Sequence, residues 1–284
     1  MTYRQLCKKL QDAKIENAEW DALCLMEHFC SVSSTVLRTN PDRDYASKAL
    51  EDALNRRLAH EPLQYILGEW EFFRQKYEVT PDCLIPRSDT EILVETAIRI
   101  LPTQARFADL CTGSGCIAIS TLAERPDTTA VALEKFSATL ALSQRNAQKN
   151  GVDTRFCGIL EDVLAYPIQL AEHAPFDAIL SNPPYIPTAD IEELSPEVHA
   201  EPFAALDGGK DGLIFYRAIL KNYAPLLKED GFFLFEIGFD QAQSLTALAK
   251  EQNFKHIRII RDFGGNDRVV YISNIPYGER SQTL

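Results

Sequence analysis

The sequence predicts an α/β protein in which a small helical bundle precedes a doubly wound, mostly parallel sheet with one antiparallel strand. Three observations lead to this class. From Arg106 onward, apolar strand-like runs alternate with helical segments, which is the pattern of a parallel sheet. A glycine-containing loop follows the first of these runs. The last two runs are joined only by residues 264–267, a connection too short for a helical crossover but long enough for an antiparallel hairpin.

Composition limits the class of protein before any motif is considered. The chain has 284 residues, of which 45% are hydrophobic and 25% charged, as in globular proteins with a sizeable core of one or two domains. Its net charge of −12 and the lack of any run of three Lys or Arg favour a protein substrate over nucleic acid. No signal peptide and no 18-residue apolar run is present, so we expect a cytoplasmic protein without membrane contact. Seven cysteines without a CxxC pair and five scattered histidines lead us to expect no metal.

Residues 1–68 carry the pattern of several short helices. Leu6 and Leu10 share a face, Trp20, Leu23 and Glu27 follow a three-to-four spacing, and a later stripe is Tyr45, Leu50, Leu54 and Leu58. Ser and Asn clusters at 31–35 and 40–41 separate them. We therefore expect a small bundle whose core is made by these stripes.

Residues 69–85 change to strand-like alternation around a polar turn, which predicts a β-hairpin linking two domains. The alternating apolar residues are Trp70, Phe72, Tyr77 and Val79. Ser88 and Glu91 then have the spacing of a capping box, so a helix should begin there. Its apolar face would carry Leu93, Val94, Ala97, Ile98 and Leu101.

The strands of the sheet follow as seven runs. The five expected to be parallel are Arg106–Leu110, Thr129–Glu134, Arg155–Ile159, Phe176–Ser181 and Gly231–Ile237. The final pair is His256–Arg261 and Arg268–Ile272. Because this pair forms a hairpin, the parallel sheet should be closed by one antiparallel strand.

The loop after the first strand is the candidate cofactor site. It reads Asp109-Leu110-Cys111-Thr112-Gly113-Ser114-Gly115, and its glycines allow the backbone to approach a ligand at a helix N-terminus. Glu134 ends the next strand, where a carboxylate can accept hydrogen bonds from both hydroxyls of a ribose. The loop alone suits NAD or a structural turn equally well, although Ala118 breaks the G-x-G-x-x-G spacing of NAD sites.

Two further residues lie just beyond the third strand. Asp162 is placed to reach the amino group of an adenine, although an exposed loop aspartate is nearly as good an interpretation. Val163 beside it would supply an apolar wall for the same ring. The candidate cofactor residues are therefore Asp109, Cys111, Thr112, Gly113, Ser114, Gly115, Glu134, Asp162 and Val163.

Asn182-Pro183-Pro184-Tyr185 at the end of the fourth strand is the signature of methyltransferases that alkylate a planar amide or amine nitrogen. An amide nitrogen is a poor nucleophile because its lone pair is delocalised, so it must be held and aimed. The Asn182 side-chain oxygen can accept one N–H and the Pro183 carbonyl the other, while the prolines fix φ. Tyr185 offers an aromatic face near a sulfonium methyl. A simple strand-ending turn is the alternative, but the glycine loop and Glu134 beside this motif favour S-adenosylmethionine.

Together these motifs resemble the bacterial protein-(glutamine-N5) methyltransferases of class-1 peptide chain release factors, also called PrmC or HemK. The resemblance covers essentially the full chain. The other segments that are similar to the family are residues 61–68, 85–91, Glu201-Pro202, 205–213, Arg261-Asp262 and 266–268. The chain departs from the family pattern at Cys111, where the family often has Gly.

The resemblance implies a class I S-adenosylmethionine-dependent methyltransferase fold and methylation of the glutamine N5 in the Gly-Gly-Gln motif of release factors. Asn182 and Pro183 would be catalytic, Asn182 to Tyr185 would bind substrate, and Asn182 would also border the cofactor. Residues 1–68 would recognise the substrate, 69–85 would link, and 86–284 would carry the chemistry. We expect a monomer with no direct nucleic-acid contact. The alternatives are a ribosomal-protein glutamine methyltransferase, an adenine-N6 methyltransferase and a non-catalytic cofactor-binding scaffold.

Overall fold

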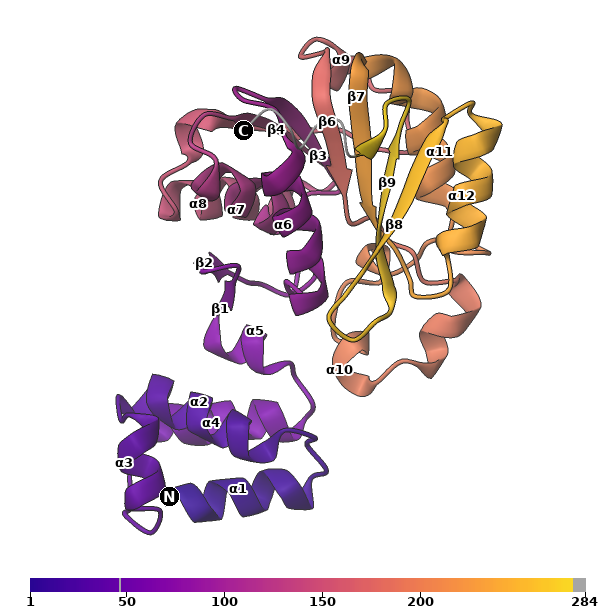
Figure 1. Ribbon diagram of the computed structural model, residues 1–284. Helices are drawn as coiled ribbons and strands as arrows, with labels where there is room; N and C mark the ends of the chain where they lie inside the picture. The colour runs from indigo at the N-terminus through magenta and orange to yellow at the C-terminus, as the bar shows by residue number, and fades with distance from the viewer. Residues whose placement is uncertain (46, 278–284) are drawn as a thin grey trace. The chain divides into compact units, whose positions relative to one another are not determined.

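The computed structural model in Figure 1 describes residues 1–45 and 47–277. The chain divides into two compact units. The first consists of Met1–Glu69 and Ser195–Ala200, and the second of Trp70–Leu194 together with the chain from Glu201 onward. The end of the expected 86–284 domain, residues 278–284, lies outside the described residues.

The first unit is helical. Its helices are α1 (Tyr3–Asp12), α2 (Ala18–Cys30), α3 (Ser34–Thr39), α4 (Lys48–Leu58), α5 (Leu63–Leu67) and α10 (Pro196–His199). Leu6, Leu10, Leu50 and Leu54 are buried as the stripes predict. Trp20 is the exception, because 57% of its surface is exposed while Leu23 on the same helix is buried. The prediction that Trp20 belongs to the core is therefore wrong.

A buried arginine holds the distant segment 195–200 in the first unit. Arg57 is 3% exposed and lies 2.7 Å from Asp21 Oδ2 and 2.5 Å from Glu197 Oε1. Its guanidinium also donates to the carbonyl of Glu61. A charge this deeply buried requires such partners, which explains why a short helix so far along the chain packs with the bundle.

The predicted hairpin is confirmed as β1 (Glu69–Phe72) and β2 (Gln75–Glu78). Its two turn residues, Phe73 and Arg74, have φ values of 44° and 67°, as expected of a tight two-residue turn between twisted strands. Phe72 and Tyr77 are buried in the core of the second unit. The Tyr77 hydroxyl lies 2.6 Å from Ser120 Oγ, so the hairpin is anchored to this unit.

The next helix, α6 (Glu91–Ile100), follows a 3-10 turn, η1 (Ser88–Thr90). The prediction of a helix here is confirmed. The predicted pairing of Ser88 with Glu91 is wrong, because Glu91 Oε1 accepts the N–H of Phe73 at 3.0 Å. A tertiary donor has taken the carboxylate that the local pattern assigned to a capping box.

The second unit is built on a seven-stranded sheet, which confirms the predicted fold class. Its strands are β3 (Arg106–Leu110), β4 (Thr129–Glu134), β5 (Phe156–Leu160), β6 (Phe176–Ser181), β7 (Leu227–Glu236), β8 (His256–Arg261) and β9 (Asp267–Ser273). The order is β5-β4-β3-β6-β7-β9-β8, and β9 is the one strand that runs opposite to the others, antiparallel to both β7 and β8. The antiparallel strand thus lies between β7 and β8 and not at the edge of the sheet.

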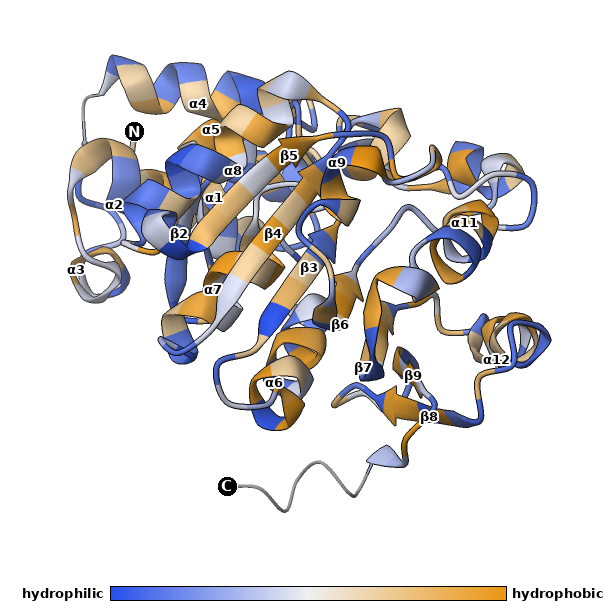
Figure 2. Ribbon diagram, turned by 90° about the horizontal axis from the view of Figure 1, so that it is seen from above, coloured by the Kyte–Doolittle hydropathy of each residue, from blue (hydrophilic) through white to orange (hydrophobic). Residues whose placement is uncertain are grey.

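Helices cover both faces of this sheet, as Figures 1 and 2 show. One face packs against α6, α7 (Cys116–Glu124) and α8 (Ser137–Lys149). The other packs against α9 (Ile168–Ala171), α11 (Ile214–Asn222) and α12 (Ala242–Glu251). Successive residues of β7, Phe232 to Phe235, alternate between these two cores, so the strand is apolar throughout. None of the helices in the described ranges is long and apolar enough to cross a membrane.

Short 3-10 turns complete the second unit, at η2 (Asp153–Arg155), η3 (Thr188–Glu193), η4 (Phe203–Ala205) and η5 (Ala224–Leu226). The chain order reverses at β3, whose neighbours are β4 on one side and β6 on the other. In open α/β sheets, ligands bind at the carboxyl ends of the strands next to such a reversal. The fold therefore directs attention to the ends of β3, β4 and β6.

Candidate active site

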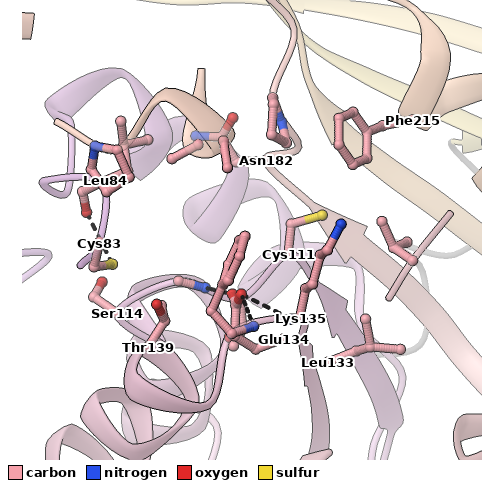
Figure 3. Close-up of a pocket in the computed structure, with 18 of the residues that line it drawn as sticks. Cys83, Leu84, Cys111, Ser114, Leu133, Glu134, Lys135, Thr139, Asn182 and Phe215 are labelled. Carbon is pink, nitrogen blue, oxygen red and sulfur yellow. Dashed lines mark hydrogen bonds between the residues drawn. The ribbon is translucent and has the colours of Figure 1, made fainter. Parts of the chain in front are cut away.

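A cavity of about 350 Å³ lies at this position in the second unit. Its walls come from the loop after β3, the end of β4, the loop after β5 and the end of β6, together with residues 82–87 and 202–209. Figure 3 shows Cys111, Glu134 and Asn182 arranged around it. Of the predicted site residues, the cavity wall contains Cys111, Thr112, Gly113, Ser114, Glu134, Asp162, Val163, Asn182 and Pro184.

Asp109 shapes the glycine loop from behind. Its side chain is fully buried, and Oδ2 accepts the Thr112 hydroxyl at 2.6 Å and the Ala118 N–H at 3.2 Å. Burial raises the pKa of this carboxyl to about 7. Asp109 therefore connects the loop to the start of α7, and the cavity wall is formed by the residues that follow it.

Gly115 serves packing, because a Cβ there would lie 2.6 Å from Ile119 Cδ1 and 3.2 Å from Ser143 Cβ. It lets α7 approach α8 closely, and its φ of 83° favours glycine as well. Cys111 has a φ of 57° without being glycine. This left-handed conformation costs a residue with a Cβ about 1–2 kcal/mol, so position 111 is strained where the family often has Gly.

Glu134 is held in one orientation by three backbone N–H groups. Oε2 accepts from Gly113 at 3.1 Å, and Oε1 accepts from Lys135 at 2.9 Å and from Phe136 at 3.1 Å (Figure 3). The side chain is buried, and burial raises its pKa despite these bonds. A carboxylate at the end of β4 is thus fixed at the floor of the cavity and joined to the glycine loop.

Asp162 faces a cation that the sequence did not reveal as part of the site. Its Oδ2 lies 2.9 Å from Lys135 Nζ, and its Oδ1 accepts the Leu164 N–H at 2.9 Å. Val163 is buried and contributes apolar surface to the same wall. Lys135 follows Glu134 at the end of β4, so its position next to Asp162 could be expected only once β4 and β5 were known to be neighbours.

Asn182 presents an acceptor that lacks a partner. Its Nδ2 donates to Thr90 Oγ1 at 3.2 Å, whereas its buried Oδ1 has no hydrogen-bond partner within the described residues. Buried polar atoms are nearly always hydrogen-bonded, and an exception needs an explanation. An oxygen of this kind in a cavity wall is suited to accept an N–H from a bound molecule.

Pro183 and Tyr185 are not among the residues that line the cavity, and Tyr185 is fixed by contacts with neighbouring segments. The Tyr185 carbonyl accepts from Gln241 Nε2 at 2.9 Å, and burial raises the pKa of its phenol to about 12. A Cβ on Gly208 would lie 2.7 Å from Tyr185 Cα, and one on Gly212 would lie 2.3 Å from the Tyr185 carbonyl oxygen. Gly208 and Gly212 therefore let the 205–213 segment pack closely against this loop.

Sequence reasoning missed several residues of the site. Thr90 lines the cavity beside Asn182, and Phe215 faces it from α11 (Figure 3). Glu236 ends β7 next to β6 and is 1% exposed. A carboxylate that ends a buried apolar strand was the available signal for Glu236. In the part of the chain that the structure describes, no group of three or more His, Cys, Asp or Glu is arranged to hold a metal ion.

Comparison with known proteins agrees with this geometry. Residues 2–68 match the PrmC N-terminal domain and residues 88–203 match the methyltransferase small domain. The chain is 40% identical over 266 residues to the release factor glutamine methyltransferase of Geobacter sulfurreducens, which covers 92% of this chain and 91% of that protein. It is 36% identical over 268 residues to the protein of the same name from Caulobacter vibrioides, with coverage of 92% and 91%.

A solved structure of the hMettl16 catalytic domain in complex with the MAT2A 3'UTR hairpin 6 has a TM-score of 0.58 and 15% identity. The match covers 79% of this chain and 82% of that one. It shows a shared methyltransferase fold alone. The full-length relatives carry the assignment, and the chain belongs to the family of release factor glutamine methyltransferases.

Proposed function

We propose that the protein transfers a methyl group from S-adenosylmethionine to the side-chain amide N5 of the glutamine in the Gly-Gly-Gln motif of class-1 release factors. The single observation that best supports this substrate is the unpartnered Oδ1 of Asn182, a buried acceptor at the end of β6. A primary amide has two N–H donors, and an acceptor fixed in the cavity wall is what its recognition needs. The names of the relatives support the same reaction.

The cavity residues fit the cofactor. Glu134 is pre-oriented to accept from ribose hydroxyls, and the glycine loop brings backbone close to the cavity at the start of α7. Asp162 and Val163 would border the adenine. When bound, the cofactor supplies an electrophilic methyl group on a sulfonium.

The residues of the chain would act mainly by orienting the amide. Asn182 Oδ1 and the Pro183 carbonyl each accept one N–H, so the nitrogen faces the methyl group and cannot rotate. The nitrogen held in this way would accept the methyl group, and the thioether S-adenosylhomocysteine would be released as the second product. Orientation and the two carbonyl dipoles are then the main contributions to rate. The alkylated amide is acidic enough to lose its proton to water, so no prior general base is needed.

The first unit would recognise the body of the release factor. The enzyme would be a monomer and would act in the cytoplasm. Its exposed Trp20 supports a role in protein binding, since large aromatic side chains often anchor protein interfaces. The net charge of −12 argues against direct nucleic-acid contact.

The experiment is to incubate the protein with methyl-labelled S-adenosylmethionine and, in parallel, purified release factor, ribosomes and tRNA. We expect label in the release factor alone, and no label when its Gly-Gly-Gln glutamine is replaced by alanine. Label in a ribosomal protein or in tRNA, with none in the release factor, would assign the enzyme to one of the alternative substrates.

A further inference from the structure

Glu236 is a buried carboxylate beside Asn182 that the proposed reaction does not yet use. Ser181 of β6 pairs with Phe235 of β7, so Asn182 and Glu236 are the next residues of two adjacent parallel strands. Both lie at the carboxyl edge of the sheet. Glu236 is 1% exposed, and among the described residues its Oε2 has no hydrogen-bond partner.

Thr90 connects these two side chains. Its hydroxyl oxygen accepts from Asn182 Nδ2 at 3.2 Å, and the residue is 2% exposed. A hydroxyl carries a single hydrogen, so an oxygen that accepts from Asn182 must direct its own hydrogen to another acceptor. The buried Oε2 of Glu236, at the neighbouring strand end and without a partner among the described residues, is an acceptor available for this hydrogen. An ionised carboxylate only accepts, so above its pKa Glu236 would be the end of a short chain of hydrogen bonds.

We propose that Glu236 is a positioning residue that sets the direction of the hydrogen bonds through Thr90 and thereby keeps Asn182 Oδ1 turned toward the substrate amide. The inference rests on the proposed function, because it explains how that site selects a group with two N–H donors. With an acceptor at 236, Thr90 Oγ1 directs its hydrogen to Glu236 and continues to accept from Asn182 Nδ2, on the side away from the substrate. The Asn182 Oδ1 atom is then the part of the side chain that faces the substrate amide.

A donor at position 236 would remove this direction. A glutamine NH₂ can donate to Thr90 Oγ1, and the threonine hydrogen can then point at Asn182. The Asn182 carboxamide would lower its energy by turning through 180°, which presents an NH₂ group to the N–H of the substrate. Two donors facing each other leave both unpaired, and an unpaired buried group is costly.

Charged and titratable groups from several elements interact electrostatically with Glu236. They are Arg268 from β9, Asp89 from η1, Tyr185 after β6, Tyr216 from α11 and Cys116 from α7. Arg268 is shared between Asp89 at 3.1 Å and Asp262 at 3.2 Å. The nearest cation is therefore largely engaged elsewhere, and burial raises the pKa of Glu236 to about 7 in spite of it. The fold retains a carboxylate here against its desolvation cost, which is common at functional sites.

The test compares Glu236→Gln with wild-type protein in single-turnover methylation of a release factor at saturating S-adenosylmethionine and pH 8, above the pKa of Glu236. We expect the rate to fall about tenfold or more, as for coupled residues in contact, while the Kd for S-adenosylmethionine by calorimetry stays within about twofold. Glu229→Gln is the matched control, because it removes an exposed carboxylate from the same strand and should leave the rate unchanged.

Two further comparisons separate positioning from general stability. In the Asn182→Ala background, Glu236→Gln should cause no further loss, since its effect passes through Asn182. Thr90→Val should behave like Glu236→Gln, and Thr90→Ser, which keeps the hydroxyl, should remain near wild type. These threonine variants test the chain of hydrogen bonds even where Glu236→Gln folds poorly.

The outcomes distinguish this inference from the proposed function. Additive losses in the double variant, or normal rates for both Glu236→Gln and Thr90→Val, would overturn the positioning role while wild type still methylates the release factor. A wild-type protein that does not methylate release factor would overturn the proposed function and this inference with it.

Discussion

Single residues of the site differ in how their hydrogen-bonding capacity is used. Glu134 is held by three backbone donors, whereas Asn182 Oδ1 has none within the described residues. Leaving a buried acceptor unpaired costs about 1–3 kcal/mol. The two side chains therefore suit different tasks. Glu134 offers a bound ligand a carboxylate of fixed orientation, whereas Asn182 Oδ1 gains a hydrogen bond only when the substrate binds.

Replacing Glu134 with alanine should weaken S-adenosylmethionine binding. Each lost hydrogen bond to a charged acceptor costs about 1.5–3 kcal/mol, and the Gly113 N–H that anchors the loop is also released. Calorimetric titration measures the change in Kd. The exposed Glu172→Ala is a suitable control and should bind normally. Unchanged affinity for Glu134→Ala would remove Glu134 from the cofactor site.

Replacing Asn182 with alanine should lower the rate of methyl transfer much more than cofactor affinity. Alanine leaves one amide N–H of the substrate unpaired and the nitrogen free to rotate, and loss of an aiming contact typically lowers rate about 10²-fold. Single-turnover methylation of a release factor at saturating cofactor provides the measurement. A near-normal rate would show that the amide clamp is wrong, and activity on an adenine-containing nucleic acid would show that the substrate class is wrong too.

Glu236 should make the protein less stable as pH rises. Burial raises its pKa to about 7 from 4.5, so between these values the folded state holds a proton that the unfolded state has released. Stability therefore falls with pH across this window, by up to about 3 kcal/mol once pH exceeds 7. Glu236→Gln removes this titration, so its stability relative to wild type should be higher at pH 8 than at pH 5.5.

Urea unfolding at the two pH values measures the difference. Buried Asp109 titrates in the same range but is present in both proteins, so it cancels in the comparison. A stability difference between Glu236→Gln and wild type that is equal at pH 5.5 and pH 8 would contradict the raised pKa.

At the scale of secondary structure, the sequence predicted the elements that have a clear hydrophobic pattern of their own. It did not predict which elements contact one another. β3, β4, β6 and β8 have the predicted bounds, and the first three are buried parallel strands, which form mostly apolar runs. The capping box failed because Phe73, from the hairpin, uses Glu91. Thr90 and Glu236 were missed since their relation to Asn182 depends on strand order, which no local pattern contains. Lys135 beside Asp162 was missed for the same reason.

Asn146 of α8 shows how one helix supports both the hairpin and the glycine loop. It is fully buried; Oδ1 accepts the Glu78 N–H at 2.7 Å, and Nδ2 donates to the carbonyls of Glu78 at 3.1 Å and Ser114 at 2.9 Å. A side chain with these three bonds connects β2, α8 and the cavity wall.

Asn146→Ala should therefore destabilise the protein by about 3 kcal/mol, because it leaves three buried backbone groups unpaired. It should also weaken cofactor binding by releasing Ser114. Urea unfolding and calorimetry measure the two effects. Gln148→Ala on the exposed face of the same helix should change stability by less than about 0.5 kcal/mol. Equal effects of the two variants would contradict the bridging role.

At the scale of the whole molecule, the chain consists of two compact units, and the cavity belongs to one of them. Every described residue of the cavity wall lies in the second unit. The first unit contains the exposed Trp20 and a bundle closed by Arg57, Asp21 and Glu197. If this unit recognises the release factor, Trp20→Ala in the full-length protein should raise KM for release factor and leave kcat unchanged. A variant that lowers kcat instead would argue for a role of Trp20 in folding or catalysis.

A chain that begins at Glu69 should still bind S-adenosylmethionine but methylate intact release factor poorly. It keeps the hairpin, because Phe72 and Tyr77 pack in the core of the second unit, although residues 195–200 lose the bundle they pack with, including the Arg57 partner of the half-exposed Glu197. Calorimetry should give a Kd for cofactor within about twofold of the full chain, which also shows that the shortened protein is folded.

Methylation of intact release factor should fall at least about tenfold, since a second binding module raises the local concentration of substrate. A short Gly-Gly-Gln peptide is too small to bind both units, so the full chain and the shortened chain should methylate it at the same rate. Full activity of the shortened chain on intact release factor would show that the second unit alone recognises its substrate.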